Sequence, residues 1–181
     1  KCLETWKYGH GKRFFYLIDP RFPQFEPFLK LPNFGAIAEK DKELRKAALD
    51  QSKVIFEVAT PAGYDPSKQY PLLLALHGGG STLEKLKTHW ISPRLRQEFI
   101  IVYVQSYLHY DLKTFGWAGF DPRARDEIKR CFQEVTDRYL IDERCKIIGG
   151  ISAGGVAALD FAIHDIIPVT GVLGVCPGKP R

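Results

Sequence analysis

A serine between glycines follows an apolar run in the last third of this 181-residue sequence. Gly150, Ser152 and Gly154 fit the pattern Gly-x-Ser-x-Gly, with a strand-like segment before them and a helix-like segment after them. On a sharp turn between a strand and a helix a serine is exposed for nucleophilic attack, and side chains two positions away would collide unless very small. The first turn of the helix adds N–H groups and partial positive charge, which suit a developing anion. The spacing predicts a nucleophile at Ser152; a small residue in a glycine-rich turn is the alternative.

A second group of glycines follows an earlier apolar run. His77 precedes Gly78, Gly79 and Gly80 where a strand is predicted to end. A flexible backbone there can turn N–H groups towards the serine and stabilise a tetrahedral intermediate, and one such donor is worth about a hundredfold or more in rate. We expect the N–H groups of Gly79, Gly80 and Ala153 to form this oxyanion hole. We expect His77 to shape the loop, not to act as a base.

The elements that must position these residues are predicted from hydrophobic patterning. From residue 53 onwards, short apolar runs alternate with helical or turn segments, as in βαβ units around a mostly parallel sheet. The predicted strands span residues 53–59, 71–76, 99–105, 145–149 and 170–175. Continuous apolar runs at 72–76 and 100–104 predict strands covered on both faces. Asp121 followed by Pro122 predicts the start of an amphipathic helix that lies on the sheet.

The first 50 residues follow no such pattern. Aromatic residues crowd between positions 6 and 16, prolines follow, and residues 36–50 are predicted to be helical. We expect residues 1–50 to be an N-terminal extension packed on or near a main domain of residues 51–181. Packing is the favoured role of its aromatics, and a lid or partner surface is the alternative.

Residues 53–178 resemble the α/β-hydrolase superfamily, and within it the carboxylesterase branch, which includes phospholipase/carboxylesterase and polyhydroxyalkanoate-depolymerase-like esterases. The resemblance rests on the apolar run that ends in His77 and its three glycines, and on residues 149–155 around Ser152. It implies an α/β fold with a mostly parallel sheet flanked by helices. It also implies a serine hydrolase that cleaves a small-molecule carboxylic ester through an acyl-enzyme on Ser152.

The sequence departs from this family after Ser152. The family places an acidic residue and then a histidine after the serine, whereas the candidates here are Asp160, Asp165 and His164. His164 would lie roughly 18 Å along the helix from Ser152, too far to take its proton. At i, i+4 near the end of the helix, Asp160 and His164 predict a surface hydrogen bond or a charge at the helix C-terminus. We therefore expect the chain to end before the last strands of the fold, with the triad acid and histidine beyond residue 181.

Composition narrows the classes of partner. The 26 basic and 21 acidic residues are interleaved, so the net charge of +5 predicts a solvated surface and no nucleic-acid binding. No apolar run reaches the roughly 20 residues of a membrane span. Because no metal-ligand spacing and no nucleotide-binding motif occur, we expect neither a metal ion nor another cofactor. Four widely spaced cysteines predict buried free thiols, which weakly favours a reducing compartment such as the cytoplasm; because their number is even, disulfides are the alternative. The oligomeric state stays open.

Two alternatives to an esterase stay open. A peptidase or thioesterase of the same fold would use the same serine. A non-catalytic module with a hydrolase-like fold would keep Ser152 in its turn and bind a partner through the aromatic N-terminal segment. Tyr107 and Trp117 follow the third predicted strand, where they could line a substrate pocket or simply pack.

Overall fold

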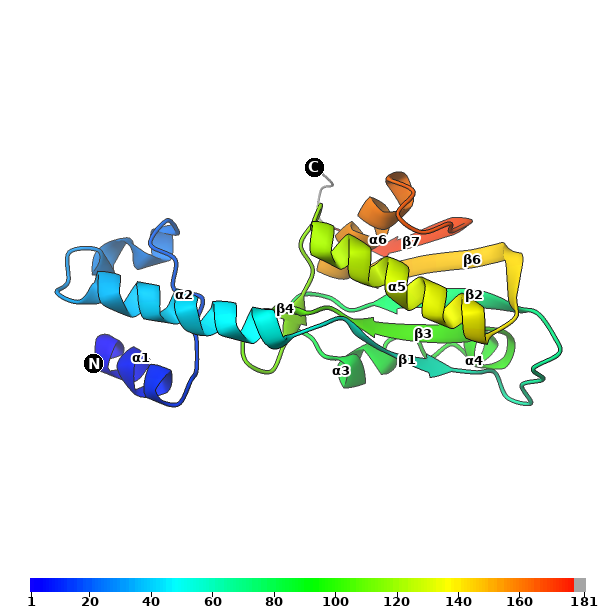
Figure 1. Cartoon of the computed structure of the whole chain (residues 1–181), viewed down its shortest axis with the longest axis horizontal. Helices are drawn as coiled ribbons and strands as arrows, with labels where there is room; N and C mark the ends of the chain where they lie inside the picture. Colours follow the sequence, from blue (N-terminus) through cyan, green and yellow to red (C-terminus); the bar gives the residue numbers. More distant parts are fainter. Residues whose placement is uncertain (178–181) are drawn as a thin grey trace. The chain divides into compact units, whose positions relative to one another are not determined.

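The computed structural model describes residues 1–177 and divides into two compact units. One unit comprises Lys1–Ser52 and His109–Lys113. The other comprises Lys53–Leu108 and the described residues from Thr114 onwards. The first unit is helical, and the second is built around a sheet (Figure 1).

The first unit contains helices α1 (Cys2–Gly11) and α2 (Phe34–Gln51) and the 3₁₀ helix η1 (Pro23–Phe28). Its apolar core consists of Ile18, Phe34, Ile37 and Ala38. Trp6 packs against this core, and its ring centroid lies 5.1 Å from that of Phe28. The helix predicted at residues 36–50 is present as α2. Helix α1 was not predicted, because its inner face has only Leu3 and Trp6 as large apolar residues and continues with Gly9 and His10.

A buried carboxylate joins α1, α2 and the chain between them. Asp41 on α2 is 1% exposed, and its oxygens accept hydrogen bonds from the N–H groups of Tyr16 and Ile18. The Nε2 atom of His10 on α1 lies 2.9 Å from the same carboxylate. Burying a charge is costly unless hydrogen bonds replace its water. Asp41 therefore stabilises the unit only while all three donors stay in place.

The second unit is built around a five-stranded sheet in the order β1-β3-β2-β6-β7. The strands are β1 (Ile55–Ala59), β2 (Tyr70–Leu76), β3 (Ile100–Gln105), β6 (Ile141–Ile151) and β7 (Gly171–Val175). Strand β1 runs antiparallel to β3, and the other neighbouring pairs are parallel. The mostly parallel sheet predicted from the sequence is confirmed, although β6 begins at Ile141 and not at residue 145.

Helices flank this sheet (Figure 1). They are α3 (Leu83–Lys87), α4 (Pro93–Glu98), α5 (Pro122–Arg138) and α6 (Ala153–Ile163), and the short strands β4 (Leu108–His109) and β5 (Phe115–Gly116) precede α5. Strand β3 is buried along its whole length, as is β2 from Leu72 onwards. One face of these strands packs against Leu83, Leu86 and Trp90. The apolar runs thus correctly predicted strands covered on both faces.

Helix α5 begins where the sequence predicted. The carboxylate of Asp121 accepts hydrogen bonds from the N–H groups of Arg123 and Ala124, and Pro122 is the first helical residue. The other oxygen of the Asp121 carboxylate accepts a hydrogen bond from the hydroxyl group of Tyr107. The Tyr107 side chain is buried. Tyr107 is therefore a packed residue that supports the helix start, which agrees with the packing interpretation of its sequence position.

All four cysteines are free thiols, but only Cys131 on α5 is buried, and burial raises its pKa to about 12. Cys145 is half-buried, whereas Cys2 and Cys176 are exposed. The prediction of buried thiols is wrong for Cys2, which lies at the exposed start of α1, and for Cys176, which follows the end of β7. No helix within residues 1–177 is both long enough and apolar enough to cross a membrane.

We predict that Asp121→Ala lowers the free energy of unfolding by about 2–4 kcal/mol. About 1 kcal/mol comes from the lost helix cap, and about 1–3 kcal/mol from leaving the Tyr107 hydroxyl buried without a partner. Urea unfolding followed by circular dichroism measures the change. Asp126→Ala, at an exposed position of the same helix, is the control and should change stability by less than about 0.5 kcal/mol. Equal losses in the two variants would contradict this role of Asp121.

Candidate functional site

Ser152 is the single residue between β6 and α6. Its φ of 51° and ψ of −115° lie in a region that residues with a side chain rarely adopt, at a cost of about 1–3 kcal/mol. Its N–H donates to the carbonyl of Val175 at the end of β7, at 2.9 Å, and its own carbonyl accepts from the N–H of Val156, at 3.1 Å. The Ser152 side chain is exposed and does not cap α6. The predicted strand, turn and helix are thus present, with the serine at the turn.

The glycines around Ser152 leave no room for a side chain. A Cβ atom on Gly150 would lie 2.1 Å from the carbonyl oxygen of Gly154. A Cβ atom on Gly154 would lie 2.3 Å from the carbonyl oxygen of His77. The predicted collision across the turn is correct for Gly150. Gly154 is required for a different reason, because the first turn of α6 approaches the backbone at the end of β2.

The loop of Gly78, Gly79 and Gly80 lies beside Ser152. Strands β2 and β6 are parallel neighbours, so their carboxyl ends meet at the same edge of the sheet. A Cβ atom built on Gly78 would lie 3.8 Å from that of Ser152, and one built on Gly79 would lie 3.8 Å from that of Ala153. Gly80 follows in the same loop with a φ of 68°, which favours glycine. The structure therefore brings Ser152, Ala153 and Gly79 together.

Backbone N–H groups are available at this edge. Ala153 is the first residue of α6, so its N–H has no acceptor within the helix. Among residues 1–177, the N–H groups of Gly79 and Gly80 donate to no backbone carbonyl. An anion placed between the loop and the start of α6 could accept hydrogen bonds from these groups.

His77 is fully buried directly before the glycine loop. Its Nδ1 atom lies 2.7 Å from the carbonyl oxygen of Gly78, and its Nε2 accepts the N–H of Ser106 at 3.1 Å. Because a backbone N–H can only donate, Nε2 carries no proton and Nδ1–H donates to Gly78. Burial lowers the pKa of His77, which favours this neutral ring. His77 holds the loop in place, as expected, and neither ring nitrogen is free to take a proton from Ser152.

Asp160 and His164 lie towards the other end of α6. His164 is the C-cap residue and Ser152 the N-cap residue, so the length of the helix separates them, as predicted. The Nδ1 atom of His164 lies 3.0 Å from a carboxylate oxygen of Asp160. The prediction of a surface hydrogen bond is wrong in one respect, because Asp160 is only 5% exposed and pairs with Arg125 of α5. Asp160 therefore joins α6 to α5, a contact for which the sequence held no signal.

Trp117 is also buried, with its ring centroid 5.6 Å from that of His77 and 6.1 Å from that of Phe161. Trp117 therefore packs against His77 and Phe161, which agrees with the packing interpretation of its sequence position.

A backbone bridge that sequence reasoning missed holds the far end of the glycine loop. The N–H of Ser81 donates to the carbonyl of Phe115 at 3.2 Å, and the N–H of Phe115 donates back at 2.8 Å. Backbone pairing between two isolated residues leaves no pattern in a sequence. Together with the bond from Ser106 to His77, this bridge fixes the loop at both ends. No cluster of three or more His, Cys, Asp or Glu that could hold a metal ion occurs within residues 1–177.

Comparison with solved structures identifies the fold. An uncharacterized protein from Bacillus cereus is 25% identical, with a TM-score of 0.56 over 94% of this chain and 53% of that chain. The Bacillus cereus carboxylesterase is 19% identical, with a TM-score of 0.52 over 72% and 62%. A putative dipeptidyl aminopeptidase IV from Bacteroides ovatus is 18% identical, with a TM-score of 0.51 over 70% and 20%. The fold is that of the α/β-hydrolases.

The chain spans about half the length of the first of these structures. No protein-family model matches the sequence, and no curated protein is significantly similar to it.

We predict that Gly150→Ala and Gly154→Ala each destabilise the second unit by about 3 kcal/mol or more, because the new methyl group would overlap backbone atoms that packing holds in place. Thermal and urea unfolding measure this loss. Gly171→Ala in β7 is the matched control, since its Cβ would meet only a side-chain carbon at 3.7 Å. Comparable stability of all three variants would show that the turn is less closely packed than described.

We predict that stability depends on pH through His77. The folded pKa of His77 is lowered, so below the unfolded value of about 6.5 the unfolded chain binds a proton that the folded chain lacks. This contribution is complete above about pH 6.5 and decreases as the pH falls. His77→Gln should therefore lose less stability than wild type between pH 7.5 and 5, measured by urea unfolding. The exposed His89→Gln is the control and should keep the wild-type slope; an unchanged slope in His77→Gln would refute the assignment.

Proposed function

We propose that this chain belongs to a serine hydrolase that cleaves carboxylic esters, with Ser152 as the nucleophile. The observation that carries the proposal is the turn between β6 and α6, which holds an exposed serine in a strained conformation beside free N–H groups. Strain of this kind persists where the surrounding structure imposes it, and it is frequent at active sites. Without a catalytic role, no feature of this turn requires a serine side chain.

The proposed reaction proceeds in two steps. The Ser152 oxygen attacks the ester carbonyl carbon while a triad histidine takes its proton, and the collapsing tetrahedral intermediate releases the alcohol, which receives that proton. Water then attacks the acyl-enzyme in the same way and releases the acid. During both steps the N–H groups of Gly79, Gly80 and Ala153 would stabilise the negative oxygen. Neither His77, whose two ring nitrogens are engaged, nor His164, at the other end of α6, is placed to be that histidine.

Two observations favour a carboxylic ester as the substrate. The residues around His77 and Ser152 resemble the carboxylesterase branch, and a carboxylesterase is among the solved structures with this fold. A putative aminopeptidase shares the fold as well, so a peptidase or thioesterase remains the second candidate. Both candidates use the same serine and differ in the leaving group that the site accepts.

We predict that the full-length protein hydrolyses p-nitrophenyl esters and that Ser152→Ala lowers kcat/KM by about 10⁴-fold or more. Ser92→Ala is the matched control, because Ser92 is also an exposed serine at the start of a helix and makes no capping bond. It should keep wild-type activity. Full activity in Ser152→Ala would refute the proposal, and cleavage of anilides or thioesters in preference to esters would favour the second candidate.

A further inference from the structure

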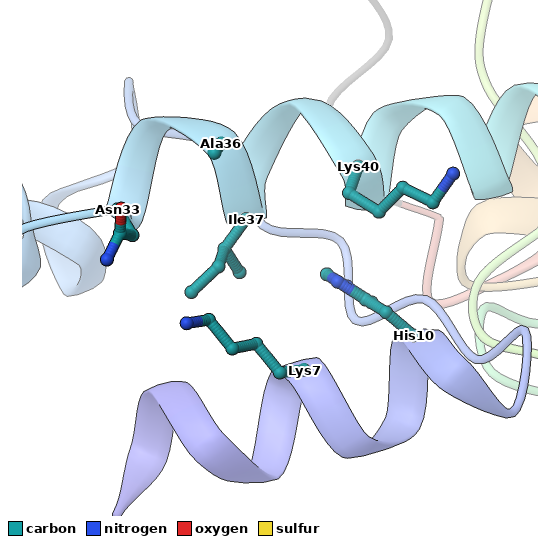
Figure 2. A pocket seen from close by; sticks show the side chains of 6 residues that line it. All are labelled: Lys7, His10, Asn33, Ala36, Ile37 and Lys40. Carbon is teal, nitrogen blue, oxygen red and sulfur yellow. The ribbon is translucent and has the colours of Figure 1, made fainter.

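A pocket of about 340 Å³ lies in the helical unit, and no residue of the proposed active site lines it. It is lined by Lys7 and His10 of α1 and by Asn33, Ala36, Ile37 and Lys40 at or near the start of α2 (Figure 2). This volume is in the range of sites for small molecules. The mixed lining, with long polar side chains around an aliphatic surface, indicates a ligand that has both a polar and an apolar part.

The charge of the lining has one sign. Lys7 and Lys40 line the pocket, and no Asp or Glu does. Within residues 1–177, Lys7 forms no ion pair, and Lys40 pairs with Glu43 at 3.0 Å in an exposed contact of the kind that contributes little. The buried Asp41 carboxylate accepts hydrogen bonds on the other side of His10 and does not line the pocket. The pocket therefore favours an anion.

Hydrogen-bond donors and an apolar surface complete the lining. Asn33 is the N-cap residue of α2, has a φ of 68°, and makes no capping hydrogen bond, so its side-chain amide is available to a ligand. In Figure 2, Lys7 extends from α1 towards Ile37, and Asn33 extends from α2 towards α1. Ile37 also lines the pocket, and the small part of its side chain that is exposed would contact the apolar part of a ligand.

His10 gives this pocket a fixed wall. Its side chain is only 6% exposed, and Asp41 holds its Nε2 atom. A ring fixed in this way cannot swing into the pocket and fill it. The two lysines, by contrast, are exposed and can adjust to a ligand.

We propose that the pocket between α1 and α2 binds a small organic anion, a carboxylate or phosphate monoester that carries a short apolar group. Lys7 and Lys40 would contact its charge, Asn33 would donate a hydrogen bond, and Ile37 with Ala36 would contact its apolar part. This site is independent of Ser152, so it stands whether or not the chain hydrolyses esters.

The test is a titration of the ¹⁵N-labelled protein with benzoate at low ionic strength, followed by NMR, with phenyl phosphate in a second titration. We expect saturable shifts of the Asn33 side-chain amide and of the Ile37 N–H with at least one of the two anions. Benzamide is the matched neutral probe and should bind at least tenfold more weakly. Added salt should weaken the binding of the anions, because the contacts are exposed.

Variants locate the binding. Lys7→Gln and Lys40→Gln should each weaken it by about fivefold or more, the effect of losing one ionic contact. Lys46→Gln is the control, because Lys46 lies on α2 in an exposed pair with Asp50 and does not line the pocket. The absence of saturable shifts with both anions, equal binding of benzamide, or equal binding by all three variants would overturn the proposal. Lys7 and Lys40 lie on different helices. If one of the two variants misfolds, the binding measured with the other variant still tests the proposal.

Discussion

The arrangement of the candidate active site depends on the close approach of two backbones. The first turn of α6 touches the end of β2 at Gly154, where a Cβ atom would lie 2.3 Å from the carbonyl oxygen of His77. Only glycine permits this distance. Because Ser152 precedes α6 by one residue and the glycine loop follows His77 by one residue, the contact brings the serine and the loop to the same place.

The surroundings of the loop make this arrangement rigid. His77 is neutral and buried, and its two ring nitrogens join the carbonyl of Gly78 to the N–H of Ser106. Ser81 pairs with Phe115 at the other end of the loop. Donors that are already oriented cost no reorganisation when charge develops in a reaction, which is the main source of rate in sites of this type. The buried strands β2 and β3 supply the stability that offsets strain at Ser152.

Local sterics and burial explain what could be predicted from the sequence. Continuous apolar runs predicted the central strands, since a strand buried on both faces has no polar side. Gly150 predicted the turn at Ser152, because its collision with Gly154 is set within four residues, whereas the contact of Gly154 with His77 is long-range. Asp121 with Pro122 predicted the start of α5 for the same reason.

Long-range contacts account for the rest. The pairing of Asp160 with Arg125 depends on how α5 and α6 meet, and neither helix shows it in its own pattern. Helix α1 has an apolar stripe of only Leu3 and Trp6, which continues with Gly9 and His10 and is too short to predict a helix. The pocket between α1 and α2 could not be predicted either, because its lining residues come from two helices that the sequence pattern does not bring together.

The most direct test of the central claim, that Ser152 and the glycine loop form one catalytic site, is a crystal structure of the full-length protein treated with a serine-directed phosphonate. The account predicts phosphorus bonded to the Ser152 oxygen, with the phosphoryl oxygen accepting hydrogen bonds from the N–H of Ala153 and from Gly79 or Gly80. An unmodified Ser152, or a phosphoryl oxygen directed away from these N–H groups, would contradict it.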